Sequence, residues 1–113
     1  MSDPQRELAT VSDGDGPTAD LAATALGSAS AVTRLRAAIL ALAAHRGPDS
    51  SICPSDAARA VGGEHWRDLM NDSRSTALAL ARNGDVDITQ RGEAVDPRHP
   101  PRGPIRIRIS PPR

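Results

Sequence analysis

The chain has 113 residues, a length that suits one small domain. Hydrophobic residues make up 38% of it, charged residues 25% and aromatic residues 1%, and 14 basic residues balance 14 acidic ones. These proportions exclude a disulfide-stapled scaffold and a collagen-like or coiled-coil rod, and they argue against a membrane protein. Trp66 is the lone aromatic residue, which disfavours a module that stacks several bases on aromatic rings.

The cysteine content and the N-terminal sequence bear on the compartment. Cys53 is the single cysteine and has no partner for a disulfide within the chain, so a reducing cytoplasm is the expectation. The N-terminus carries acids where a signal peptide needs positive charge. The longest strongly apolar run, residues 37–44, is far shorter than the roughly 20 residues of a membrane span. We therefore expect a cytoplasmic protein with no membrane partner.

Residues 1–29 differ in composition from the rest of the chain. They are rich in Asp, Gly, Ser, Thr and Ala, and large apolar side chains are few. Such a segment buries too little surface to offset the entropy lost on ordering. The sequence therefore predicts a disordered acidic tail over residues 1–29, which is able to fold over a basic surface and compete with a polyanion.

The helical signals begin after this segment. Val32, Leu35, Ile39 and Leu42 recur at helical spacing, which predicts a helix over residues 31–45 with these four side chains on its buried face. A second helix is predicted over residues 54–61, where a proline at the first position is favourable.

Residues typical of helix ends divide the stretch from residue 53 to residue 83 into separate helices. Cys53 stands at the cap position of the second helix and Asp56 at its third position, a variant of the capping box. Trp66, Leu69 and Met70 form an apolar cluster in a short helix predicted over residues 64–70. A longer helix is predicted over residues 72–83.

The hydrophobic period then changes from helical to alternating. Residues 86–90 and 105–109 each alternate apolar and polar side chains, which predicts two strands with one buried face. A loop rich in Pro, Gly and Arg joins them, and a short strand at Ile52 is expected to pair with this hairpin. Three main helices followed by a β-hairpin predict an α+β fold over residues 30–110, a winged helix-turn-helix with the hairpin as its wing.

Several stretches also resemble a known family. The segment ICPSDAARAVGGEHWRDLM, followed by ITQRGEAVDP and GPIRIRI, resembles a bacterial family of small proteins described only as a domain of unknown function. The resemblance covers about residues 33–109 and implies a winged helix fold, with no established activity. Asn71 stands where the family pattern has a proline that opens the third helix, and Asn can cap the same helix.

The arginine distribution suggests a nucleic-acid interface. Residues 31–113 hold thirteen Arg against nine acids, with the excess near the C-terminus. In a winged helix the third helix usually enters the major groove of double-stranded DNA, and the wing can contact the backbone or the minor groove. The candidate DNA-binding residues are Ser73, Arg74, Thr76, Arg82, Arg91, Arg98 and Arg102.

The alternative is a protein-protein interaction module that binds no nucleic acid, in which the wing or an exposed strand edge docks a partner. A further reading is that these arginines form a solvated face paired with Asp68, Asp72 and Asp85. The modest positive excess is compatible with either role, and the sequence does not indicate the oligomeric state.

The cysteine, the histidines and the tryptophan are explained by ordinary structural roles. At a helix N-terminus the Cys53 thiol meets the positive end of the macrodipole, which favours a reactive thiolate, but a buried cap is the commoner role. Together with Cys53, the residues His45, His65 and His99 match no zinc-binding spacing, so we expect no metal and no cofactor. Trp66 is expected to pack in the core. The sequence holds no catalytic motif, and we expect no enzyme.

Overall fold

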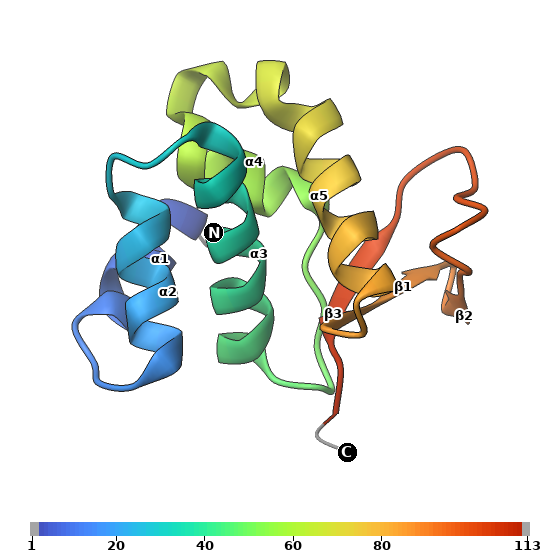
Figure 1. The fold of residues 1–113 in the computed structure, drawn as a ribbon, viewed down its shortest axis with the longest axis horizontal. Helices are drawn as coiled ribbons and strands as arrows, with labels where there is room; N and C mark the ends of the chain where they lie inside the picture. Colours follow the sequence, from blue (N-terminus) through green and yellow to red (C-terminus); the bar gives the residue numbers. More distant parts are fainter. Residues whose placement is uncertain (1–2, 112–113) are drawn as a thin grey trace.

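The computed structural model describes residues 3–111 and contains helices followed by a small sheet (Figure 1). In chain order the elements are α1 (Pro4–Ser12), α2 (Pro17–Leu26), α3 (Ala31–Arg46), α4 (Pro54–Gly62), the 3-10 helix η1 (Gly63–Leu69), α5 (Met70–Arg82), β1 (Val86–Gln90), β2 (Glu93–Ala94) and β3 (Arg106–Ile109). The fold is therefore α+β, and every helix and strand predicted from residue 31 onward is present within a few residues of its expected bounds.

The three strands form an antiparallel sheet in the order β2-β1-β3. Val86 pairs with Ile109 and Ile88 with Ile107, so the two alternating segments meet as a hairpin. The predicted short strand at Ile52 is an isolated bridge to Ile107, with N···O distances of 2.8 and 2.7 Å. This bridge ties the α3–α4 connection to the edge of the sheet.

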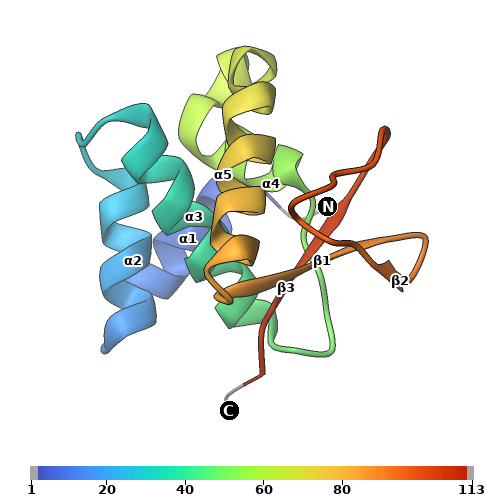
Figure 2. The same cartoon turned by 45° about the vertical axis from the view of Figure 1, so that its right-hand side comes forward.

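The helices cover one face of the sheet and leave the other open (Figure 2). Val86, Ile88 and Ile107 are buried against the helices, whereas Arg106 and Arg108, which alternate with the buried residues of β3, are exposed. α3 lies at the centre of the helical layer and contributes seven buried residues to the core. One expected core residue, Val32, is instead 54% exposed near the start of α3.

The expectation of a disordered N-terminal tail is wrong for residues 4–26, which form α1 and α2. Leu8, Ala22 and Ala25 are completely buried in the common core. The Asp3 side chain caps α1, and Arg34 Nε donates to the Ala25 carbonyl at 2.8 Å. Alanines let helices approach closely, so this segment packs well with few large side chains. Residues 1–2 of the expected tail lie outside the described residues.

Trp66 also departs from expectation, because it does not pack in the core. It lies on η1, a segment with no buried residue, and its ring is half-buried. The guanidinium carbons of Arg59 and Arg67 lie 4.6 and 4.5 Å from the ring centroid. The buried face of α4, with Ala57 and Ala60, lies in the core, whereas the Trp66 ring lies nearer the surface, where cation–π contacts with the two arginines stabilise it.

Candidate nucleic-acid interface

The loop over residues 91–105, which joins β1 to β3 and includes β2, is held in place by side chains that donate to its carbonyls. Gln90 Nε2 donates to the carbonyls of Arg102 and Pro104 at 2.7 and 3.1 Å. Arg74 Nη1 donates to the Gly103 carbonyl at 2.7 Å, and its Nη2 donates to the Pro101 carbonyl. Prolines lack an N–H to pair along a ladder, so donors from outside the loop give it a defined shape.

The candidate residues on α5 have different positions. Ser73 is completely buried, and its Oγ donates to the Pro54 carbonyl at 2.7 Å. The prediction that Ser73 contacts DNA is therefore wrong, because its hydroxyl joins α5 to α4. Thr76 is half-buried, and Arg82 is exposed with Nη1 3.4 Å from the Pro97 carbonyl.

Arg74 is a positioning residue and not a free cation. Both of its terminal nitrogens are used by the loop, so its fork fixes the loop against α5. Arginine suits this task because its planar donors meet two carbonyls at once. With the Arg82–Pro97 hydrogen bond, side chains of α5 attach to the loop at two places.

Three arginines of the loop remain available to a ligand. Arg91, Arg98 and Arg102 are exposed, and their guanidinium groups make no hydrogen bond or ion pair with any residue from 3 to 111. Arg91 has φ 53° at the turn after β1, a conformation few non-glycine residues adopt, and Gly92 follows it with φ 83°. The turn therefore starts the loop in a fixed direction.

The ion pairs expected for a solvated face are absent from the described part of the chain. Neither Asp68, Asp72 nor Asp85 pairs with an arginine there, and both ion pairs found involve Arg46. The arginines of the loop are thus not neutralised by the acids of α5 and its neighbours.

The acidic N-terminal segment does not cover this surface. α1 and α2 pack on α3 and α4, on the side of the helical layer away from the hairpin (Figures 1 and 2). The expectation that this segment folds over the basic loop is wrong for residues 4–26.

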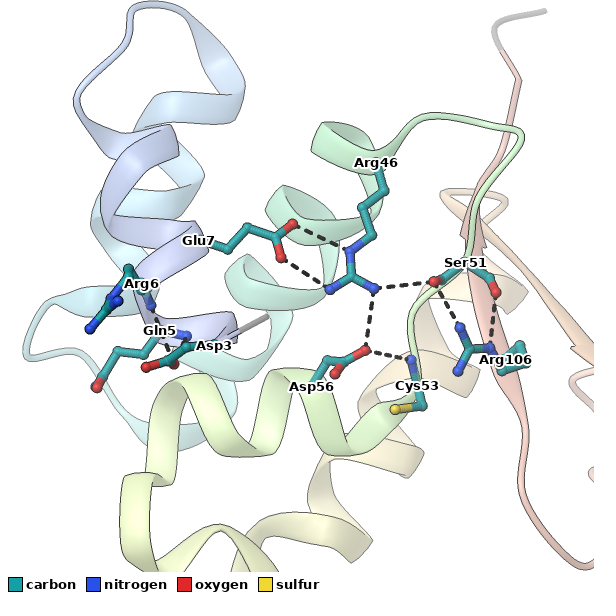
Figure 3. Close-up of polar contacts among 9 residues, drawn as sticks. All are labelled: Asp3, Gln5, Arg6, Glu7, Arg46, Ser51, Cys53, Asp56 and Arg106. Atoms are coloured by element: carbon teal, nitrogen blue, oxygen red, sulfur yellow. Dashed lines mark hydrogen bonds and ion pairs between the residues drawn. The ribbon is translucent and has the colours of Figure 1, made fainter. Parts of the chain in front are cut away.

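Arg46 at the end of α3 joins the N-terminal segment to the rest of the fold (Figure 3). Its Nε and Nη2 donate to the two carboxylate oxygens of Glu7 at 3.3 and 3.0 Å, and its Nη1 donates to the Ser51 carbonyl at 3.3 Å. Hydrogen bonding to Glu7 raises the pKa of Arg46 above its ordinary value, against the lowering effect of burial. The guanidinium is therefore a permanent charge that holds α1 on α3.

Cys53 occupies the predicted cap position of α4. The Asp56 carboxylate accepts from the Cys53 backbone N–H at 3.0 Å and lies 3.6 Å from Arg46 Nη1. The thiol is half-buried, with Sγ 2.8 Å from Ser55 Oγ. The predicted cap is confirmed, although the thiol is not fully enclosed.

The three histidines are exposed at separate places in the fold: His45, His65 and His99. Among residues 3–111, no group of three or more His, Cys, Asp or Glu side chains is placed to hold a metal ion. None of the helices in the same range combines the length and the apolar character that crossing a bilayer requires.

Comparison with known proteins gives a family without an assigned activity. No curated protein matches the chain. The family described as "Protein of unknown function (DUF3253)" matches residues 32–110, from the start of α3 to the residue after β3, and the chain belongs to this family.

Proposed function

We propose that the chain is a winged helix protein that binds double-stranded DNA through α5 and the 91–105 loop. The order of elements supports this fold, since α3, the Ile52 bridge, α4, α5 and the β1–β3 hairpin follow the winged helix sequence. In that arrangement α5 is the recognition helix and the 91–105 loop is the wing.

The observation that carries the proposal is the set of unpaired arginines beside α5. Arg91, Arg98 and Arg102 extend from a loop that Arg74 and Gln90 hold against the fold. Exposed guanidinium groups on a rigid support lose little entropy when they contact phosphates. The acids of α1 and α2 lie elsewhere and do not compete with a phosphate backbone.

The exposed part of α5 adds short polar side chains and few cations. Ser75 is exposed and Thr76 half-exposed on this helix, while Arg82 is its one exposed arginine. Such a face fits a groove without supplying much charge. We therefore expect most of the affinity to come from loop contacts to phosphates, with weak dependence on sequence.

Fluorescence anisotropy with a labelled random-sequence duplex at several salt concentrations tests this function. If three arginines each neutralise a phosphate, the slope of log affinity against log salt is roughly −3. Arg91→Ala and Arg102→Ala each reduce its magnitude by about 1 for every duplex sequence. Arg6→Ala removes the same charge from an exposed position on α1 and serves as the matched control, with no change expected.

No binding at low salt refutes the proposal and leaves the protein-interaction alternative. An equal loss of duplex affinity in Arg6→Ala and Arg91→Ala means that only the net charge of the protein matters, and it refutes the assignment of the DNA contacts to the loop.

A further inference from the structure

A polar cavity opens on the side of the sheet that the helices leave uncovered. Its volume is about 350 Å³, which is enough for a small organic molecule. The α3–α4 connection, the end of β1 and the outer face of β3 form its walls. The side chains that line it are Asp49, Ser50, Ser51, Thr89, Arg106 and Arg108.

One cation of this cavity is already held in position. Arg106 Nε donates to Ser51 Oγ and Arg106 Nη2 donates to the Ser51 carbonyl, both at 2.9 Å (Figure 3). Nη1 makes no hydrogen bond within residues 3–111. The guanidinium is therefore oriented by the protein and keeps donors for a ligand.

The second cation is free. Arg108 lies two residues further along β3 and so shares its outer face with Arg106. Its guanidinium makes no hydrogen bond or ion pair with any described residue. Asp87 lies opposite Arg108 in the strand register, and its carboxylate accepts from Ser110 Oγ at 3.0 Å. No carboxylate among residues 3–111 lies within ion-pair distance of the Arg108 guanidinium, so its donors are available to a ligand.

The donors present are suited to a phosphate group. Two guanidinium groups on one strand face provide charge-assisted hydrogen bonds to a dianion, and the hydroxyls of Ser50 and Thr89 add neutral donors. Asp49 is the one carboxylate of the cavity, and it suits a ligand that also carries hydroxyl donors. No aromatic ring lines the cavity, so there is no platform for a base.

We propose that this cavity binds a small hydroxylated phosphomonoester, such as a sugar phosphate. Arg106 and Arg108 bind its phosphate, and Asp49 accepts from its hydroxyl groups. Gly92 of the 91–105 loop borders the cavity, but none of Arg91, Arg98 and Arg102 lines it, so different arginines serve the phosphate of this ligand and the proposed DNA contacts. A backbone phosphate of DNA has related chemistry, so the experiment must distinguish the two sources.

Isothermal titration calorimetry of the full chain with ribose 5-phosphate, inorganic phosphate and ribose tests the site. Ribose 5-phosphate binds most tightly, inorganic phosphate more weakly, and ribose gives no heat. Arg108→Ala weakens ribose 5-phosphate binding about tenfold, and because this side chain is exposed and makes no hydrogen bond or ion pair within residues 3–111, the circular dichroism spectrum is unchanged. Arg98→Ala removes an exposed arginine outside the cavity and leaves binding unaltered.

Asp49→Asn separates the two parts of the ligand. This substitution weakens the binding of ribose 5-phosphate, because the sugar hydroxyls lose their carboxylate acceptor. It strengthens the binding of inorganic phosphate, because the cavity no longer holds a negative charge that repels the anion. The proposal is overturned if neither ribose 5-phosphate nor inorganic phosphate gives heat on titration. It is overturned as well if Arg98→Ala and Arg108→Ala lose affinity for ribose 5-phosphate equally. It is also overturned if free phosphates fail to bind while Arg108→Ala weakens duplex DNA, since the ligand is then the DNA backbone. Failure of DNA binding itself leaves these titrations unaffected.

Discussion

Truncation of one side chain on α1 tests whether the N-terminal helices belong to the cooperative fold. Leu8 is 0% exposed and lies in the same core cluster as Ala22, Ala25 and Leu35. A buried Leu→Ala change costs about 2–5 kcal/mol, from lost apolar transfer and from the cavity left behind. The free energy of unfolding of a small domain is about 5–15 kcal/mol, so Leu8→Ala removes a large part of the stability.

The assay is urea unfolding followed by circular dichroism and by the fluorescence of Trp66. The two signals report different regions, because circular dichroism averages all helices and the indole reports its own surroundings near Asp3, Pro4 and Gln5, which line the same cavity. Coincident transitions that shift together in Leu8→Ala indicate one cooperative unit.

Thr10→Ala is the control on the same helix. Thr10 is exposed and its hydroxyl bonds only within α1, to the Arg6 carbonyl at 3.2 Å, so a change within about 0.5 kcal/mol is expected. If Leu8→Ala and Thr10→Ala have the same small effect, α1 does not contribute to the folding free energy, and the reasoning from its burial is refuted.

Three further substitutions probe the site and its supports. Arg74→Ala removes the two donors that hold the loop, so hydrogen exchange of the Val95 and His99 amides, which donate to carbonyls in the described structure, accelerates while the core amides stay protected. Ser73→Ala leaves the Pro54 carbonyl without this donor and lowers the unfolding free energy by about 1–3 kcal/mol, with duplex affinity unchanged where the protein is folded. Trp66→Ala costs less than the roughly 3–5 kcal/mol of a core tryptophan, as measured by urea unfolding.

Each of these expectations has a result that contradicts it. Unchanged exchange in Arg74→Ala means that Gln90 alone holds the loop. Weaker DNA binding by folded Ser73→Ala means that this hydroxyl reaches the ligand. A loss of 3–5 kcal/mol in Trp66→Ala means that the indole supports the core despite its exposure.

The helices and strands from residue 31 onward were predictable because their signals are local. Helical spacing in residues 31–45 and the Cys53–Pro54 cap mark α3 and α4, and alternation marks β1 and β3. These patterns depend on neighbours a few residues away, which the sequence displays directly. Even there, Val32 follows the helical spacing and is exposed, because it lies at the edge of an open groove between α3 and α5.

The N-terminal helices were missed because their packing depends on small residues. Ala22 and Ala25 bury little surface each, and only the partner helix makes them a core face. Low apolar content therefore indicated disorder. The signals that favoured helices were Pro4 and Pro17 at first helical positions, with Asp3 as a cap.

The candidate site was predicted in part. Arg91, Arg98 and Arg102 are exposed as expected, because a loop rich in Pro, Gly and Arg has no buried face. The structural uses of Ser73 and Arg74 are tertiary, since their acceptors are 19 and 27–29 residues away in the chain. No local sequence pattern distinguishes an arginine that donates to a backbone carbonyl of the protein from one whose guanidinium is available to a ligand.

The position of α2 has a practical consequence for anyone who expresses a shortened form. The family match begins at residue 32, but α2 packs along α3, and its Ala22 and Ala25 belong to the same buried cluster as the residues of α3. A fragment trimmed to the matched residues presents the side of α3 that α2 covers to water, and newly exposed apolar surface promotes self-association. Aggregation of such a fragment would reflect where it was cut, and would say nothing about how the intact chain behaves.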